Sequence, residues 1–240
     1  MPRANRYILP GQHYHVTHRC HNRSFLLRFA RDREEYRRRL REALGQFGVK
    51  LLTYCITSNH THLLLDAEST AELSGLMQKL EGEFAEYYNL RKRRSGAFWG
   101  GRYHATMIAS GEHLWNCMKY IELNMVRAGV VRHPREWPWC GFPELVGERK
   151  RYRLLDLRRV LDACGGGAQQ DFVQSYRQSI ELAIHQGTLA REPIWTESIA
   201  VGPQAFVTSI AQQTGNRVQL ETAEVTEGVW SIRETGTSYG

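Results

Sequence analysis

Two histidines stand one residue apart in "SNHTHLLLD", residues 58–66, at the start of an apolar run. Successive side chains of a β-strand point to opposite faces, so His60 and His62 share one face while Thr61 and Leu63 share the other. Two imidazoles on one face can bind one metal ion. A His-x-His pair alone is a weak signal, because neutral histidines also serve as ordinary surface or core residues.

A polar stripe runs along the helix that hydrophobic periodicity predicts for residues 111–127, "GEHLWNCMKYIELNMVR". At about 100° per residue, this stripe contains Asn116, Tyr120, Asn124 and Arg127. A different face carries the apolar residues Leu114, Cys117, Met118, Ile121 and Met125. Because Tyr120 and Asn124 lie one turn apart, a group bound by one is within reach of the other. A solvated polar face would show the same pattern.

The combination of His60, His62 and Asn124 suits a divalent ion that keeps positions open for substrate oxygens. We expect Mg²⁺ or Mn²⁺ in a mixed nitrogen and oxygen shell. Such an ion polarises a phosphate and offsets the charge of the transition state, while a tyrosine hydroxyl attacks phosphorus in line. A tyrosine with its ordinary pKa of about 10 needs help from the metal or a base.

The elements that position these residues follow from alternation and helical spacing along the chain. Strands are predicted at 13–19, 49–57, 60–66 and 96–109, and helices at 32–48, 70–93 and 111–127. Strand, helix, strand, strand, helix, strand is the order of the ferredoxin-like split βαβ unit, an antiparallel sheet with helices on one face. We therefore predict an α+β core, to which the helix at 111–127 is an addition.

The rest of the chain is predicted to be a mostly helical C-terminal tail. Residues 1–150 form one domain in this interpretation, 151–170 a linker with a "GGGAQQ" hinge, and 171–240 the tail. The tail carries two helical patterns, "DFVQSYRQSIELAIHQG" and "GPQAFVTSIAQQTG".

Charge is unevenly distributed between these parts. Residues 1–160 hold 28 Lys and Arg against 16 Asp and Glu, a net +12, while residues 161–240 hold 4 against 9, a net −5. A basic face binds polyanions such as nucleic acid, although many basic faces are merely solvated. No apolar stretch reaches the roughly 18 residues of a membrane span, and we predict a cytoplasmic protein with no membrane partner.

The motifs resemble a known family. "SNHTHLLL" is similar to the Asn-His-hydrophobic-His block, and "YIELNMVRAGVV" to the tyrosine helix, of the single-tyrosine, His-hydrophobic-His transposases. Within that family, the sequence most resembles the subgroup of REP-associated tyrosine transposases, over about residues 3–147. Thr61 stands where a larger hydrophobic residue is usual, and Met125 where Pro often follows the Asn. Thr61 faces away from the metal and Met125 continues an apolar face, so we expect both to be tolerated.

The resemblance implies a bacterial, nucleoid-associated enzyme that acts on palindromic repeats folded into hairpins. His60 and His62 would bind the divalent ion and Asn124 would complete its ligands. Tyr120 would attack a single-stranded DNA phosphate, leaving a 5′-phosphotyrosine link and a free 3′-OH. The family includes dimers, whereas the subgroup includes monomers, so both states stay open.

A hairpin with an adjoining single strand needs a basic track and flat side chains. The candidate DNA contacts are Arg37, Arg38, Arg41, Arg91, Lys92, Arg93, Arg94, Arg102, Tyr103 and Arg127. Phe98 and Trp99 are further stacking candidates, and core packing is at least as good an interpretation of both.

Two other functions fit some of these residues. A domesticated protein could bind hairpin DNA with little or no turnover, although an intact His60, His62, Tyr120 and Asn124 argue against that. A metal hydrolase of small phosphoesters would use the same ion, would leave the +12 of residues 1–160 unexplained, and would keep its activity without Tyr120.

Overall fold

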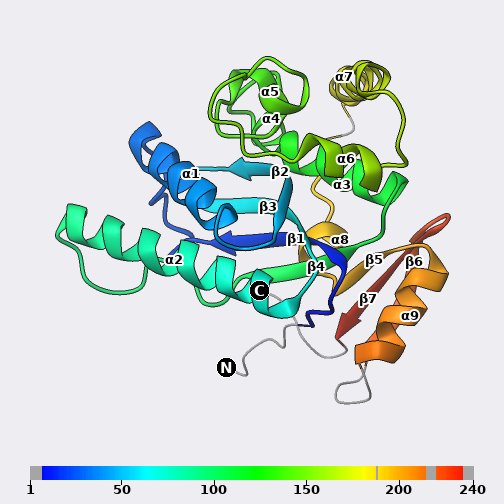
Figure 1. Ribbon diagram of the computed structural model, residues 1–240, viewed down its shortest axis with the longest axis horizontal. Helices are drawn as coiled ribbons and strands as arrows, with labels where there is room; N and C mark the ends of the chain where they lie inside the picture. Colours follow the sequence, from blue (N-terminus) through cyan, green and yellow to red (C-terminus); the bar gives the residue numbers. More distant parts are fainter. Residues whose placement is uncertain (1–6, 188, 215–219, 235–240) are drawn as a thin grey trace.

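Figure 1 shows the computed structural model, which describes residues 7–187, 189–214 and 220–234. Within these residues the strands form one sheet in the order β2-β3-β1-β4-β5-β7-β6. The strands are β1 (Gln12–Arg19), β2 (Lys50–Ile56), β3 (His60–Ala67), β4 (His104–Ile108), β5 (Ala200–Gly202), β6 (Leu220–Thr226) and β7 (Val229–Glu234). Neighbouring strands are antiparallel except for β4 and β5, which are parallel.

The predicted split βαβ unit is confirmed. Its chain order is β1, α1 (Ala30–Leu44), β2, β3, α2 (Thr70–Lys92) and β4, and its strands lie in the order β2-β3-β1-β4. Helices α1 and α2 pack side by side on one face of the sheet. Tyr36 and Leu40 of α1 and Phe84 of α2 are buried there, as the periodicity predicts.

A second layer covers the opposite face. It contains α3 (Glu112–Glu122), α4 (Asn124–Arg127), α5 (Phe142–Leu145), α6 (Leu157–Ala163) and α7 (Gln169–His185), with a short 3₁₀ turn at Pro134–Glu136; another 3₁₀ turn, His21–Arg23, follows β1. Leu64 of β3 packs there with Leu114 and Ile121 of α3 and Tyr176 of α7. The β2-β3-β1-β4 part of the sheet is therefore buried on both faces, and α3 is the predicted addition (Figure 1).

The helix predicted at 111–127 is interrupted at Leu123, where ψ is 1°. Tyr120 consequently lies in the last turn of α3, and Asn124 is the first residue of α4. The N–H of Arg127 still donates to the carbonyl of Leu123 at 2.8 Å. The polar stripe therefore continues across the interruption.

The C-terminal region contains the two predicted helices, as α7 and α9 (Gln204–Thr214), and the short α8 (Ile194–Glu197). It also contributes β5, β6 and β7, which the sequence did not predict. Strand β5 has three residues, too few to show alternation, and residues 221–226 of β6 are all exposed, so no buried face marks that strand. Residues 188, 215–219 and 235–240 of the predicted tail lie outside the described residues. Among the described residues, no helix is long and apolar enough to cross a membrane.

The segment predicted as a linker is partly structured. Helix α6 lies in it and begins at the N-cap Asp156, whose side chain accepts from the N–H of Arg159 at 3.0 Å. The outer side of β2 is bonded to this segment and to the loop before it, since Asp156 N–H donates to Leu51 O and Ile56 N–H donates to Trp139 O, both at 2.9 Å.

A buried carboxylate joins α1, β2 and this region. Glu144 is 0% exposed. Its Oε1 accepts from Arg37 Nη2 at 3.0 Å and from the Tyr54 hydroxyl at 2.8 Å. Its Oε2 accepts from the N–H groups of Leu154 at 2.6 Å and Leu155 at 3.1 Å.

Replacing Glu144 with Ala is expected to lower the free energy of unfolding by about 3–5 kcal/mol, because the buried Arg37 guanidinium loses its buried carboxylate partner. Urea denaturation at pH 7.5 measures the change. The Glu42→Ala variant is the control: Glu42 pairs with Arg38 on the exposed side of α1, and its loss is expected to change stability by less than about 0.5 kcal/mol. Equal effects of the two variants would contradict this account.

Candidate active site

His60 stands at the start of β3, and its neighbour Asn59 fixes which ring nitrogen carries the proton. Asn59 Nδ2 donates to the carbonyl of Arg23 at 3.1 Å, so Asn59 Oδ1 is an acceptor. His60 Nδ1 lies 2.7 Å from that oxygen and must be the protonated nitrogen. The lone pair of His60 Nε2 is therefore available to a ligand.

His62 lies on the same face of β3, with its ring centroid 4.8 Å from that of His60. It is 2% exposed. Its Nδ1 is 2.8 Å from His15 Nε2, and its Nε2 is 3.0 Å from Asn124 Nδ2. Strand β3 and helix α4 thus bring His60, His62 and Asn124 together.

Tyr120 lies beside this group. Its ring centroid is 6.2 Å from that of His62, 6.1 Å from that of His15 and 6.3 Å from that of Trp195. The guanidinium carbon of Arg127 lies 4.2 Å from the centroid of the Tyr120 ring, and Arg127 Nη2 donates to the Tyr120 carbonyl at 3.0 Å. The phenol is 6% exposed and packs between these groups.

Burial sets the charge of the site at neutral pH. It lowers the pKa of His60 to about 3, with further repulsion from Arg19 and Arg127. It also lowers the pKa of His62 well below its ordinary value, and His60 and His15 add to that shift. Burial raises the pKa of Tyr120, which Arg127 partly offsets. Both histidines are therefore neutral and able to ligate a metal, while the phenol keeps its proton.

These shifts predict that the protein loses stability in mild acid. Burial lowers the pKa of His15 to about 3, so between that value and 6.5 the unfolded chain binds one more proton at His15 than the folded chain does. Stability is present above 6.5 and falls as the pH drops, by about 2 kcal/mol at pH 5 for this histidine alone. Urea denaturation at pH 7.5, 6.0 and 5.0 in EDTA measures the slope.

The His15→Gln variant is expected to have a shallower slope than the wild type, by about one proton. His21→Gln, at an exposed position, is the matched control and should follow the wild type. A His15→Gln slope equal to that of the wild type would show that His15 titrates alike in both states.

The donor set fits a divalent ion with few protein ligands. Two imidazole lone pairs and one carboxamide meet at His60, His62 and Asn124, and rotating the carboxamide by half a turn exchanges its oxygen and nitrogen. The part of the chain that the structure describes has no cluster of three or more His, Cys, Asp or Glu able to hold a metal. A metal at this site would therefore rely on the Asn124 carboxamide oxygen as its third protein ligand.

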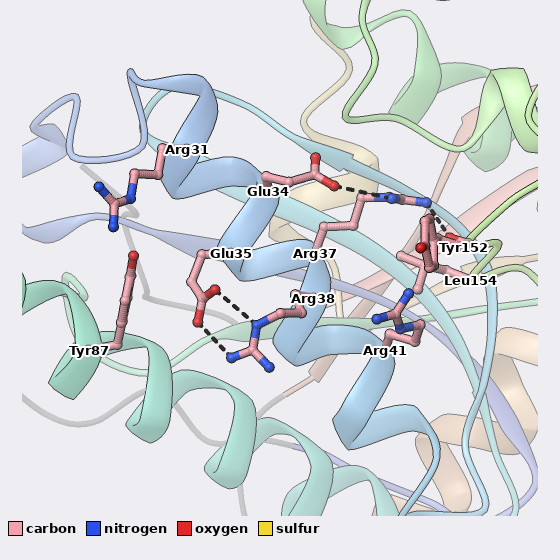
Figure 2. Close-up of a pocket in the computed structure, with 9 residues that line it drawn as sticks. All are labelled: Arg31, Glu34, Glu35, Arg37, Arg38, Arg41, Tyr87, Tyr152 and Leu154. Atoms are coloured by element: carbon pink, nitrogen blue, oxygen red, sulfur yellow. Dashed lines mark hydrogen bonds and ion pairs between the residues drawn. The ribbon is translucent and has the colours of Figure 1, made fainter.

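The arginines of α1 have different surroundings (Figure 2). Arg37 is buried and also donates to the carbonyl of Tyr152 at 2.5 Å. Arg38 is exposed and pairs with Glu35 and Glu42. Arg41 is exposed, and its guanidinium carbon lies 5.0 Å from the centroid of the Tyr152 ring.

These arginines line a hollow of about 670 Å³ between α1, α2 and the segment around Tyr152. Its lining residues are Arg31, Glu34, Glu35, Arg37, Arg38, Arg41, Tyr87, Tyr152 and Leu154. Figure 2 shows Glu34 and Glu35 reaching toward Arg37 and Arg38, so part of the positive charge is neutralised within the protein.

The basic end of α2 is also partly engaged. Arg91 pairs with the buried Asp32, and Arg94 donates to Asn89 Oδ1 at 2.8 Å. Lys92 Nζ lies 4.9 Å from the centroid of the Phe29 ring. Arg93 is exposed and ends the helix in the left-handed conformation, with φ 48°.

The segment entering β4 lies at the same end of the sheet as His60. Gly100 N–H donates to Arg19 O at 2.8 Å, and Arg19 is opposite His60 in the register of β1 and β3. Arg102 is exposed there, whereas Tyr103 is buried. Phe98 and Trp99 are buried as well, which agrees with the core-packing interpretation of both.

Sequence reasoning missed several groups at this site. His15 lies on the same face of the sheet as His62, and a histidine at an alternating position of β1 was a readable signal. No sequence signal identified Trp195, because its position beside His15 depends on contacts between distant parts of the chain. Phe25 was also missed: it is 63% exposed, in the loop that bonds to the turn before β3 through Leu27 N–H and Ser58 O at 2.9 Å.

Comparisons with known proteins agree with this fold. Residues 9–124 match the family model described as "Transposase IS200 like". A protein of Haemophilus influenzae with the provisional name REP-associated tyrosine transposase is 24% identical over 118 residues, which are 45% of this chain and 67% of that protein.

A solved structure described as a REP-associated tyrosine transposase bound to a REP hairpin shares the fold. It superposes with a TM-score of 0.53 and 18% identity, over 65% of this chain and 93% of that one. The resemblance seen in the motifs is therefore confirmed: residues 9–124, just under half of the chain, match the model of the IS200-like transposase family.

Proposed function

We propose that this protein is a REP-associated tyrosine transposase. It binds a DNA hairpin and cleaves and rejoins the adjoining single strand through a covalent link to Tyr120. The observation that carries the proposal is the meeting of Tyr120 with two neutral histidines, His60 and His62, from a distant strand. The net +12 of residues 1–160 supports a polyanionic substrate.

The chemistry proceeds in line at phosphorus. The Tyr120 hydroxyl oxygen forms a bond to phosphorus while the bond from phosphorus to the 3′-oxygen breaks. The phenol loses its proton, the 3′-oxygen gains one, and the 5′-phosphate stays on the tyrosine. Arg127, over the Tyr120 ring, favours the phenolate because it lowers the pKa of the phenol. Rejoining is the reverse attack by a 3′-OH on the phosphotyrosine.

His60, His62 and Asn124 hold the cofactor in this proposal. Mg²⁺ or Mn²⁺, when bound, polarises the scissile phosphate and offsets the charge that develops on its oxygens. The two histidines contribute their Nε2 lone pairs, and Asn124 contributes its carboxamide oxygen. Asn59 keeps His60 in the tautomer that this role requires.

Exposed cations outside the site supply the DNA path in this proposal. The candidates with exposed side chains are Arg38, Arg41, Lys92, Arg93 and Arg102. Arg37 supports the fold beneath them through Glu144. We assign stacking of an unpaired base to the exposed Phe25, because Tyr103, Phe98 and Trp99 are buried.

One observation favours a second candidate, a hairpin-binding protein with little turnover. Tyr120 is only 6% exposed, so little of its side chain is open to an incoming DNA strand. In that case binding would be retained while cleavage is slow.

Incubation with a pool of hairpin-bearing single-stranded oligonucleotides, with Mn²⁺ or with EDTA, separates the two. Denaturing gels are expected to show a protein–DNA adduct and a shortened strand with Mn²⁺ only. Hairpin binding without adduct or cleavage under any condition would favour the binding protein and reject the transposase.

A further inference from the structure

His15 is a buried histidine of β1 that lies between His62 and the C-terminal region. It is 0% exposed. Its Nε2 is 2.8 Å from His62 Nδ1, and its Nδ1 is 2.7 Å from the carbonyl oxygen of Trp195 in α8. The two imidazoles are stacked, with centroids 5.1 Å apart and planes 20° apart. Both ring nitrogens of His15 are therefore engaged.

The Trp195 carbonyl, at one end of this row of hydrogen bonds, determines which ring nitrogens of His15 and His62 carry a hydrogen. A carbonyl oxygen only accepts, so His15 Nδ1 carries a hydrogen and donates it to Trp195. A neutral imidazole has one N–H, so His15 Nε2 is an acceptor and His62 Nδ1 must donate to it. A neutral His62 then has an unprotonated Nε2, which is the nitrogen that lies against Asn124. A charged His15 would bury an imidazolium between a carbonyl and a second imidazole, which is costly.

We infer that His15 is a positioning residue, which holds His62 in the Nδ1–H tautomer and directs its Nε2 lone pair to the metal. It does so through the main chain of α8, which lies outside residues 9–124. The part of the inference that concerns the metal rests on the proposed function. Partners of this kind fix the orientation of ligating histidines, and their loss commonly weakens metal binding by about 10–100-fold.

His13, a second buried histidine of β1, has partners of a different kind. His13 lies on the same face of the strand, but its Nδ1 is 2.9 Å from a carboxylate oxygen of Asp66, and its Nε2 is 3.1 Å from Ser110 Oγ. Its ring nitrogens thus face an acid and a hydroxyl rather than a metal-site histidine. His13 is therefore a matched control for the loss of a buried imidazole from β1.

The tautomer can be measured directly in the full-length, metal-free protein. Long-range ¹H–¹⁵N correlation spectra at pH 7.5 are expected to show His62 with a protonated Nδ1 and an unprotonated Nε2, and His15 likewise. A His62 with its proton on Nε2 would overturn the inference. This readout does not depend on metal or DNA, so it stands even if the proposed function fails.

Binding of Mn²⁺ alone, measured by calorimetry, tests the consequence. His15→Phe is expected to raise the Kd for Mn²⁺ by about 10–100-fold and to shift His62 toward the other tautomer. His15→Gln, which can accept through its side-chain oxygen, is expected to restore most of the affinity. His13→Phe should bind like the wild type.

The outcomes separate the two proposals. Folded His15→Phe with wild-type affinity and an unchanged His62 tautomer would overturn the role of His15. Wild type that binds no Mn²⁺ would count against the metal site, while its spectra still decide the tautomer. If His15→Phe does not fold, the wild-type spectra and the His15→Gln variant decide the inference.

Discussion

Replacing Tyr120 with Phe is expected to abolish strand cleavage and the covalent protein–DNA link, with a fall in rate of at least about 10⁴-fold. The change removes only the attacking oxygen. The ring keeps its packing against Arg127 and Trp195, so hairpin affinity should stay within about twofold of the wild type. Denaturing gels measure the adduct and the cleaved strand, and filter binding measures the affinity.

Tyr176→Phe is the matched control for this prediction. It also removes one buried hydroxyl, which donates to Glu122 Oε2 at 2.9 Å in the core behind α3. We expect a loss of about 1 kcal/mol in stability and unchanged cleavage. If Tyr120→Phe cleaved DNA at the wild-type rate, the phosphotyrosine mechanism would be wrong and a metal hydrolase would become the better account.

Replacing His62 with Ala is expected to remove Mn²⁺ binding and to slow cleavage by at least about 10³-fold, because one of two imidazole ligands is lost. The effect should match that of EDTA on the wild type. Calorimetry with Mn²⁺ and the adduct assay measure the two losses, and circular dichroism checks that the variant is folded.

His13→Ala controls for the cavity left by a buried histidine on the same face of the sheet. It is expected to lose stability and to keep both Mn²⁺ binding and cleavage. If metal-dependent cleavage survived in His62→Ala, residues other than His62 would have to bind the ion. Hairpin binding is expected to persist in both variants, since the candidate DNA contacts lie elsewhere.

The sequence predicted the parts of this protein that depend on local periodicity. Alternation placed His60 and His62 on one face of a strand, and the helical period placed Tyr120 and Asn124 one turn apart. The order of the elements then predicted a split βαβ unit, which the structure confirms.

Contacts between distant segments were beyond such reasoning. The carbonyl of Trp195 reaches His15 because α8 lies against β1 and β4, and no pattern in the chain encodes that packing. Arg37 belongs to an arginine-rich face of α1, yet it is buried because Glu144, far along the chain, offers it a carboxylate. Similar residues on one helix thus have different roles, set by partners that periodicity cannot identify.

The pairing of β4 with β5 limits how copies of this protein can assemble. A strand at the border of a sheet is a template on which a second chain can add a strand. In the split βαβ unit, the strands at the two borders are β2 and β4. Bonds from the segment containing Trp139 and Asp156 occupy β2, and Met107 and Ile108 of β4 pair with β5. Two copies therefore cannot join their split βαβ units into one continuous sheet unless these segments are first displaced.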